Sequence, residues 1–256
     1  MPNTALITGA SSGIGREFAR YHAARGGDLI ITARRKAELE ALKSELEAEH
    51  GIKVSAHALD LGTAEGPARL YDAVKGQRID ILINNAGFGG QGNFIERDLN
   101  ADLSMIDLNV NSLVALTHMV AQDMVARGSG KILNVSSTAA YMPGPLQATY
   151  FATKAYVSSF SQALDAELRN KGVTVTALEP GYVETEFAAT ADLAGTKLVK
   201  QKAATAADVA AFGYEAMQKG QLRAINEWRL RFMLNWVMPL LPRRSALNLV
   251  KQMQAK

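Results

Sequence analysis

Short apolar runs alternate with amphipathic stretches along most of the chain, and this alternation limits the fold more than any other feature. The apolar runs predict strands at residues 4–8, 29–33, 53–59, 79–84, 131–136, 173–179 and 222–225. The stretches between them predict helices at residues 13–25, 36–50, 63–75, 102–127, 148–170 and 206–219. The strands are continuous apolar runs, as a sheet covered on both faces requires. The pattern predicts an α/β fold: a doubly wound, Rossmann-type parallel sheet with helices on both faces.

The 256 residues contain no linker, repeat or low-complexity tract, so we expect one domain. Residues 1–225 would form the catalytic domain with its sheet, and residues 226–256 would add a C-terminal amphipathic helical extension. The chain has no Cys, which excludes a disulfide scaffold, a thiolate nucleophile and a Cys-ligated metal. Its four His show no metal-ligand spacing, so we predict no metal site.

The formal net charge of +3 is unevenly distributed. Residues 221–256 hold seven basic residues and one acid, a net charge of +6, which leaves −3 for the first 220 residues. The basic character therefore belongs to the tail, and we expect no nucleic-acid partner. The N-terminus lacks a basic signal region, and the apolar run at residues 232–241 is shorter than the ~20 residues of a membrane span. These features favour a cytoplasmic protein.

A glycine-rich loop follows the first predicted strand and opens the first predicted helix. Ligands of such sheets bind beyond the carboxyl ends of the strands. Glycines there permit a tight turn and close approach of a pyrophosphate, while the helix N-terminus offers N–H groups and a positive dipole end. The loop therefore predicts dinucleotide binding. The candidate contacts are Gly9, Ser11, Ser12, Gly13, Ile14 and Gly15.

The second predicted strand ends without the acid that would bind the ribose hydroxyl of NAD. Instead Arg34, Arg35 and Lys36 follow, and a guanidinium can pair with a 2′-phosphate. This favours NADP(H) over NAD(H), with Arg34 as the first candidate and Arg16 or Arg35 assisting; the alternative is a set of solvated helix-start residues. Asp60, followed by Leu61, could accept from the adenine amino group or simply cap a helix.

Further motifs occur in a fixed order, each after a predicted strand or in a predicted helix. Together they resemble the short-chain dehydrogenase/reductase superfamily, in its single-domain branch, over about residues 3–225. Each motif alone is weak, and the complete ordered set is specific. The matching segments are Thr8 to Gly15, Asn84-Asn85-Ala86-Gly87, Asn109, Ser137, Tyr150-Phe151-Ala152-Thr153-Lys154 and Pro180-Gly181.

The resemblance implies hydride transfer between a nicotinamide and a carbonyl/alcohol pair, with Tyr150 as acid/base. Lys154 lies on the same helix face as Tyr150, and a nearby cation would lower the pKa of the phenol. Ser137 would hydrogen-bond the developing alkoxide, and it is preferred to Ser136 because the family serine precedes the tyrosine by thirteen positions. Asn109, preferred to Asn111, would bind a water linked to the lysine.

The resemblance also extends the cofactor site. It implies contacts from Asn85, Ala86, Gly87, Tyr150, Lys154, Pro180, Gly181, Val183 and Thr185. We expect an apolar substrate pocket formed by Ser137, Ala139, Tyr141, Leu146 and Tyr182. The alternative function is a non-catalytic nucleotide-binding sensor or scaffold on the same fold.

The tail places Trp228, Phe232, Trp236 and Leu240 at four-residue steps, as on one face of a helix, next to several Arg. Three interpretations remain open. The helix could pack on the body or on another subunit, lie on a membrane surface, or cap the substrate entrance. Members of the resembling family form dimers or tetramers through the two helices that here contain Asn109 and Tyr150, so we expect a homodimer or homotetramer.

Overall fold

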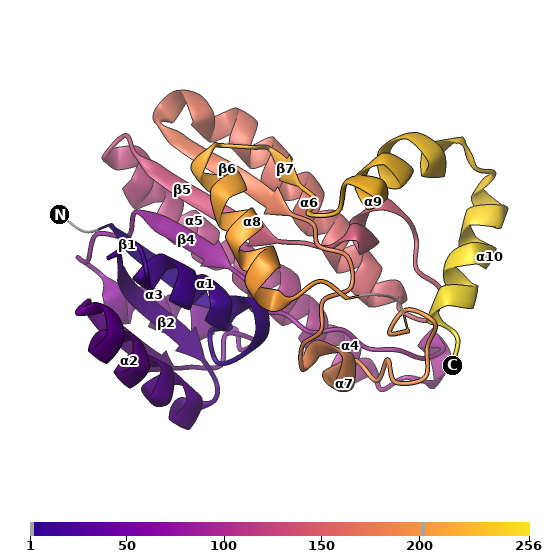
Figure 1. Ribbon diagram of the computed structural model, residues 1–256, viewed down its shortest axis with the longest axis horizontal. Helices are drawn as coiled ribbons and strands as arrows, with labels where there is room; N and C mark the ends of the chain where they lie inside the picture. Colours follow the sequence, from indigo (N-terminus) through magenta and orange to yellow (C-terminus); the bar gives the residue numbers. More distant parts are fainter. Residues whose placement is uncertain (1–2, 201–202) are drawn as a thin grey trace.

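The computed structural model describes residues 3–200 and 203–256. A seven-stranded parallel sheet runs through the molecule in the order β3-β2-β1-β4-β5-β6-β7 (Figure 1). All seven predicted strands are present, and the doubly wound class is confirmed. Their bounds are β1 Thr4–Thr8, β2 Asp28–Ala33, β3 Val54–Ala58, β4 Ile81–Asn84, β5 Gly130–Val135, β6 Val173–Leu178 and β7 Arg223–Ala224.

The helices cover both faces of the sheet and make two apolar cores. One core joins α1, α2 and α8 to side chains such as Ile7 and Ile31. The other joins α3, α5 and α6 to Leu6 and Ile30, which are the neighbours of those residues on the same strands. Burying each such side chain contributes about 1.5–3 kcal/mol. The principal helices are α1 Gly13–Ala23, α2 Lys36–His50, α3 Gly66–Val74, α4 Leu99–Ile106, α5 Leu113–Ala126, α6 Ala148–Leu168 and α8 Ala206–Gln218.

The helix predicted at residues 102–127 is one helical stretch, Leu99–Ala126, made of α4, a π-helical turn η2 (Asp107–Ser112) and α5. By length and composition this stretch could cross a membrane, and a buried core helix meets the same criterion. Here α5 packs against α3, β4 and β5. The π turn matters for the site because it contains Asn109, and such turns often lie at functional positions.

Short helical segments, which the sequence pattern did not predict, connect the strands to these helices. They are η1 Phe94–Glu96, η3 Thr138–Tyr141, η4 Arg169–Lys171 and α7 Phe187–Thr190. Of these, η3 and α7 follow β5 and β6 on the edge of the sheet where the candidate site lies.

The tail forms an arch that leaves the body after β7 and returns to it at the C-terminus (Figure 1). Its first limb is helical from Trp228 to Leu240, as α9 Trp228–Phe232, a π turn η5 Met233–Val237 and a 3-10 turn η6 Met238–Leu240. Its second limb is α10, Arg243–Gln254. Val250 of α10 is buried against Ala139 and Phe151, so the second limb packs beside the candidate site.

Candidate active site

The glycine loop after β1 is held by Asn85, which follows β4. The side-chain Nδ2 of Asn85 donates to the carbonyl oxygens of Thr8 at 3.0 Å and Gly9 at 3.3 Å. A Cβ at Gly9, where φ is +69°, would lie 2.8 Å from this nitrogen, and a Cβ at Gly15 would lie 2.3 Å from the Gly9 oxygen. The loop therefore requires glycine at both positions. The Thr8 hydroxyl also accepts from the backbone N–H of Ala86 at 3.0 Å.

The N-terminus of α1 fits a phosphate group. Ser12 occupies the N-cap position without capping the helix through its side chain, and the first turn, with Gly13, Ile14 and Gly15, contains no acid. The positive end of the helix dipole therefore has no counter-charge of its own. The loop residues predicted to contact a dinucleotide are thus together at this edge of the sheet.

Two guanidinium groups converge on Ser11, and neither belongs to Arg34. Arg35 donates from Nε and Nη2 to the Ser11 hydroxyl, at 3.3 and 3.2 Å. Arg16 donates to the Ser11 carbonyl oxygen, while its buried Nε finds no partner among the described residues. Arg34 is exposed and makes no hydrogen bond or ion pair within the described part of the chain. The orphaned Nε is the sort of donor that an anionic ligand would satisfy.

Asp60 and Leu61 serve local structure. The Asp60 carboxylate is exposed and accepts from the backbone N–H of Gly62 at 2.9 Å. Leu61 is buried in the core under α3 and α5. The carboxylate therefore closes a tight turn after β3 and does not cap a helix, because α3 begins only at Gly66 with Glu65 at its N-cap position.

Tyr150 and Lys154 lie one turn apart on α6, as their spacing predicted. The Lys154 Nζ lies 5.8 Å from the centroid of the Tyr150 ring and donates to the backbone oxygen of Val135 at 2.8 Å. The Tyr150 ring packs against Phe187 of α7, with ring centroids 5.4 Å apart. The lysine Nζ is thereby held at the end of β5, beside the ring of the tyrosine.

Burial controls the protonation of this pair. It raises the pKa of Tyr150 to about 12, opposed by a hydrogen bond with Ser137. It lowers the pKa of Lys154 to about 8. The helical spacing predicted that Lys154 would lower the pKa of Tyr150, but in the protein alone the pKa of this phenol is raised. The reason is that desolvation outweighs a lysine whose Nζ is bound to a carbonyl oxygen.

Asn109 is buried in the π turn and uses its whole amide. Its Oδ1 accepts from the backbone N–H of Phe88 at 3.1 Å, and its Nδ2 donates to the Phe88 oxygen at 3.0 Å and to the Thr153 hydroxyl at 3.1 Å. A Cβ at Gly87 would lie 2.8 Å from this Oδ1 and 3.5 Å from the Lys154 Nζ. Asn109 therefore positions the chain after β4 against the helix that carries Lys154. Asn111 instead bonds Asp107 on the surface.

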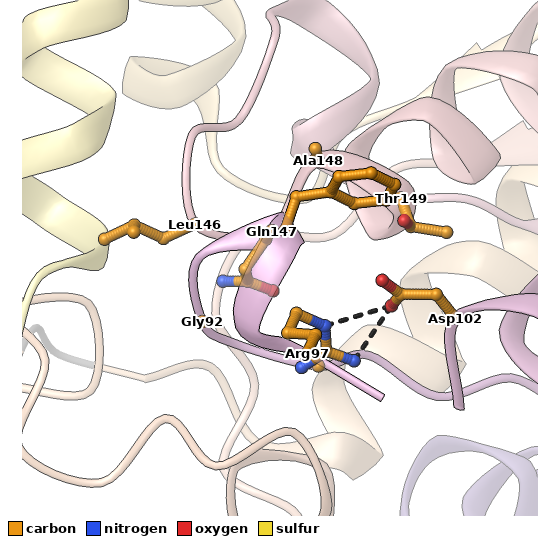
Figure 2. Close-up of a pocket in the computed structure, with 9 residues that line it drawn as sticks. Gly92, Arg97, Asp102, Leu146, Gln147, Ala148 and Thr149 are labelled. Atoms are coloured by element: carbon orange, nitrogen blue, oxygen red, sulfur yellow. Dashed lines mark hydrogen bonds and ion pairs between the residues drawn. The ribbon is translucent and has the colours of Figure 1, made fainter. Parts of the chain in front are cut away.

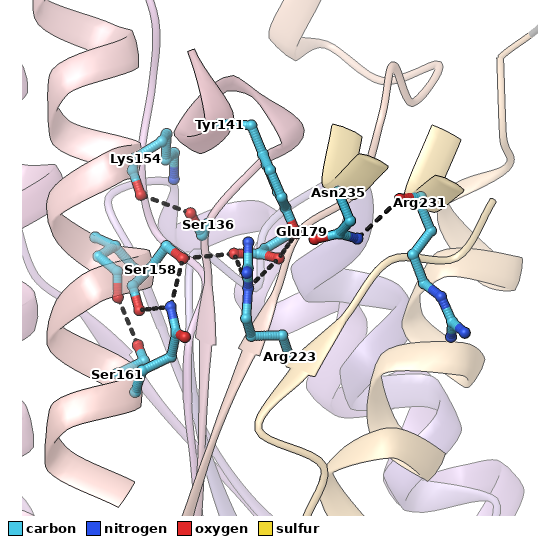
Figure 3. Close-up of polar contacts among 11 residues, drawn as sticks. Ser136, Tyr141, Lys154, Ser158, Ser161, Glu179, Arg223, Arg231 and Asn235 are labelled. Atoms are coloured by element: carbon cyan, nitrogen blue, oxygen red, sulfur yellow. Dashed lines mark hydrogen bonds and ion pairs between the residues drawn. The ribbon is translucent and has the colours of Figure 1, made fainter. Parts of the chain in front are cut away.

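The two serines after β5 make different contacts. The Ser136 hydroxyl is buried and donates to the carbonyl oxygen of Lys154 at 2.7 Å, a structural bond (Figure 3). The Ser137 hydroxyl accepts from the N–H of Ala139 at 3.1 Å, which starts η3, and lies 3.5 Å from the Pro180 oxygen. Ser137 is the serine within reach of Tyr150.

A buried carboxylate, Glu179, lies beside the site and was not singled out in the sequence, because the apolar pattern places it at the end of the strand predicted at residues 173–179. It is completely buried and accepts from Ser158 at 2.6 Å, Tyr141 at 2.7 Å and Arg223 at 3.2 Å (Figure 3). The Tyr141 ring also lies under the Arg223 guanidinium, at 4.4 Å. The Tyr141 hydroxyl, expected in an apolar pocket, is thus bound to this cluster. An acid ending an apolar strand before Pro-Gly was the available signal.

The segment after β6 closes over the glycine loop. Gly181 packs against α9, since a Cβ there would lie 2.9 Å from Leu230 and from Glu227. Val183 is buried and pairs with Ala204, whose N–H bonds the Tyr182 oxygen. The Thr185 hydroxyl accepts from the N–H of Phe187 at 3.2 Å, and its methyl would lie 3.3 Å from a Cβ at Gly13.

A small cavity of about 30 Å³ lies beside the start of α6 (Figure 2). Leu146, with φ of +69°, and Gln147 form one wall, and the buried ion pair Arg97–Asp102 forms another. The Gln147 Oε1 is buried and finds no partner in the described residues. Its Nε2 donates to Gln254 at the end of α10. The tail is therefore fastened to the turn that precedes Tyr150.

Comparisons with known proteins agree with this geometry. A family model described as short chain dehydrogenase matches residues 3–194. A very-long-chain 3-oxoacyl-CoA reductase from Anas platyrhynchos is 31% identical over 264 residues, which cover 98% of this chain and 81% of that protein. A short chain dehydrogenase from Pseudocercospora fijiensis is 36% identical over 197 residues, 75% of this chain and 63%, less than two thirds, of that longer protein.

A solved structure agrees as well. It is that of a short-chain dehydrogenase from Sphingobium yanoikuyae in complex with NADPH. The two share 32% sequence identity with a TM-score of 0.86, over 100% of this chain and 99% of that one. The tail thus has a counterpart within the length of that chain. With the sheet order, the glycine loop and the motif order on one edge, the protein belongs to the short-chain dehydrogenase/reductase family and is an NAD(P)-dependent oxidoreductase acting on a carbonyl/alcohol pair.

Proposed function

We propose that the protein interconverts an apolar ketone or aldehyde and its alcohol with NADP(H), using Tyr150 as the proton donor and acceptor. The observation that carries the proposal is the convergence of Ser137 and Tyr150 at the edge of the sheet where Lys154 and Asn109 meet Gly87. A non-catalytic sensor, the other function considered, would need the glycine loop but would have no use for this set.

The residues present fit a dinucleotide. The α1 N-terminus would receive its phosphates, Gly87 with Asn85 and Ala86 would line one ribose, and Val183 with Thr185 would hold the nicotinamide end. When bound, the nicotinamide supplies the hydride and, once oxidised, a positive charge. That charge acts in the direction opposite to burial, which raises the pKa of Tyr150 in the protein alone.

Ser137 and Tyr150 would have different roles at the substrate oxygen. In reduction, Tyr150 would give its phenolic proton to the alkoxide oxygen, and Ser137 would hydrogen-bond the same atom. Lys154, with a pKa near 8, would carry positive charge at neutral pH and favour the phenolate left behind. In oxidation the proton would travel from the alcohol to Tyr150.

The preference for NADP(H) is supported by Arg16 and Arg35, which replace Arg34 as the best placed cations. The test is affinity for NADPH and NADH in Arg35→Ala, with Arg34→Ala as the matched control. A lost phosphate contact predicts that Arg35→Ala weakens NADPH binding roughly tenfold more than NADH binding. Arg34→Ala should change the ratio little. Equal losses for both cofactors in Arg35→Ala would contradict the assignment.

An apolar substrate is supported by the side chains around the site. Ala139, Phe151 and Val250 form a small apolar cluster, with Met142 and Tyr150 packed against it. The name of one relative, a very-long-chain 3-oxoacyl-CoA reductase, is consistent with an extended apolar group. A panel of ketones and 3-oxoacyl thioesters of rising chain length, followed at the NADPH absorbance band, would test this. Turnover confined to small polar carbonyls would refute it.

We also propose that the chain forms a homodimer or homotetramer through α4, α5 and α6. Apolar side chains are exposed on two of these helices: Leu99, Leu103 and Ile106 on α4 and Tyr156 on α6. Light scattering after gel filtration would give the mass, and Leu103→Lys should shift it toward the monomer. A monomeric wild-type chain would overturn this proposal.

The first limb of the tail supports contact of a cytoplasmic protein with an anionic membrane surface. Trp228, Phe232, Trp236 and Leu240 are all at least 59% exposed, so they do not pack on the body. Five basic side chains of the tail make no ion pair within the described residues: Arg229, Arg231, Arg243, Arg244 and Lys251. Aromatic and Arg side chains together suit the interface of anionic lipids.

The membrane proposal is tested with phosphatidylserine vesicles. The wild type should sediment with them at low salt, whereas Trp228→Ala/Trp236→Ala should remain in the supernatant. Absence of salt-sensitive sedimentation would refute it. If the Trp variant instead loses its oligomeric state, the exposed aromatic side chains of the first limb contact a second copy of the chain.

A further inference from the structure

Glu186 and Arg35 form an ion pair that joins the two halves of the nucleotide crevice. The Nη2 of Arg35 lies 3.0 Å from the Oε2 of Glu186. Arg35 is the N-cap residue of α2, two residues after the end of β2, whereas Glu186 directly precedes α7 in the segment after β6. Strands β2 and β6 lie on opposite sides of the β1/β4 switch point, and ligands of such sheets bind in the crevice there.

The same guanidinium is the one that faces the glycine loop. Arg35 donates to the Ser11 hydroxyl through the nitrogen that also pairs with Glu186. Arg35 holds the pKa of Glu186 below its usual value, assisted by the Ser12 hydroxyl and the nearby Arg16. The Glu186 carboxylate is therefore ionised at neutral pH and lies where two guanidiniums and two serine hydroxyls would meet an anion.

We propose that Glu186 is an internal competitor of the cofactor 2′-phosphate for Arg35 and thereby sets the discrimination between NADPH and NADH. The inference rests on the proposed preference for NADP(H). A carboxylate and a phosphate on one guanidinium repel each other, so a cofactor bearing the 2′-phosphate must displace Glu186. A cofactor without that phosphate can bind with the ion pair intact.

The displaced segment is coupled to the reacting end of the site. Glu186 lies between Thr185, which holds the N–H of Phe187, and Phe187, whose ring packs on Tyr150. Release of the carboxylate from Arg35 therefore frees the residues that flank the nicotinamide end. Binding of the 2′-phosphate at one end of the crevice is thus linked to the position of α7 at the other.

The test is Glu186→Gln, which keeps the shape of the side chain and removes its charge. Dissociation constants are measured by calorimetry for NADPH and NADH, and for 2′,5′-ADP and 5′-AMP, which lack the nicotinamide. Because the variant has no carboxylate to hold Arg35 or to repel the phosphate, NADPH and 2′,5′-ADP should bind roughly three- to tenfold more tightly. NADH and 5′-AMP should be unchanged.

Glu184→Gln is the matched control, since Glu184 is exposed two residues away and makes no ion pair within residues 3–200 and 203–256. It should leave all four constants unchanged. In the Arg35→Ala background, Glu186→Gln should also have no effect on 2′,5′-ADP. A gain that persists there would mean general electrostatics rather than competition for Arg35, and would overturn the inference.

The remaining outcomes separate the two proposals. If Arg35→Ala weakens the binding of 2′,5′-ADP and Glu186→Gln leaves that binding unchanged, Glu186 does not compete for Arg35 and the preference for NADP(H) stands. If neither variant changes the binding of 2′,5′-ADP relative to 5′-AMP, the 2′-phosphate does not use Arg35 and the proposed preference fails with it.

Discussion

Lys154 and the end of β5 are bonded to each other in both directions. The Lys154 Nζ donates to the carbonyl oxygen of Val135 at 2.8 Å, and the carbonyl oxygen of Lys154 accepts from the hydroxyl of Ser136 at 2.7 Å. These bonds fix α6 to the strand that leads into Ser137. The distance between Ser137 and Tyr150 is therefore set by buried hydrogen bonds one residue away on one element and one helical turn away on the other.

Replacing Tyr150 by Phe removes only the phenolic oxygen. If this oxygen carries the proton, turnover should fall by about 10²- to 10⁴-fold while the NADPH dissociation constant changes little. The measurement is steady-state reduction of an accepted ketone, with cofactor binding followed by fluorescence. Tyr156→Phe, at an exposed position on the same helix, is the control and should retain activity. Comparable turnover in Tyr150→Phe would remove the tyrosine from the reaction.

Burial of Lys154 predicts a pH dependence of stability. Its folded pKa of about 8 lies below the unfolded value of 10.5, so the unfolded chain binds more protons between these values and stability rises with pH there. Relative to Lys154→Met, the wild type should therefore gain about 2 kcal/mol of unfolding free energy from pH 7.5 to 9.5.

Urea unfolding of both proteins at several pH values measures this difference. The gain should level off below pH 8, because both states are then protonated. A difference that is flat across the range would show that Lys154 keeps its ordinary pKa in the folded protein, and a difference that falls with pH would show a raised one.

The sheet and its helices were predictable because their signals are local. Continuous apolar runs and amphipathic periods fixed the elements, and parallel strands end at one edge, which brought Ser137 near Tyr150 and Asn109 near Lys154. The direction in which a side chain points at the start of a helix depends on contacts with distant residues, so it was not predictable. Arg34 directly follows β2 and is exposed, whereas Arg35 occupies the N-cap position of α2 and donates to Ser11.

Other features could not be predicted, because they depend on contacts that leave no pattern in the sequence. The π turn around Asn109 leaves the helical period of the sequence almost unchanged. The charge of Glu179 is satisfied by three donors from η3, α6 and β7, each more than 20 residues away from Glu179 in the sequence. The two limbs of the tail differ in a way that the sequence pattern did not predict. The first limb is exposed, whereas the second packs on the body beside the site.

Gly87 is the point where the chain after β4 meets both Asn109 and Lys154. A Cβ there would lie 2.8 Å from the Asn109 Oδ1, which cannot retreat because it accepts the Phe88 N–H. Gly87→Ala should lower the free energy of unfolding by about 1–3 kcal/mol and reduce turnover. Gly26→Ala, where φ is +72° and space is open, should cost about 1 kcal/mol through backbone strain alone and leave turnover intact. Unchanged turnover in Gly87→Ala would show that this contact does not contribute to the reaction.

Val250 links the C-terminal helix to the choice of substrate. It packs on Ala139, which follows Ser137, and on Phe151, which follows Tyr150, while Gln254 fastens the same helix to Gln147. Val250→Ala should therefore enlarge the apolar wall and shift the kcat/KM ratio of a bulky over a small ketone roughly tenfold toward the bulky one. Leu249→Ala, at the exposed neighbouring position, is the control. Both variants shorten an apolar side chain of α10, so a change common to both would reflect helix stability, and only a shift confined to Val250→Ala makes α10 a wall of the substrate site.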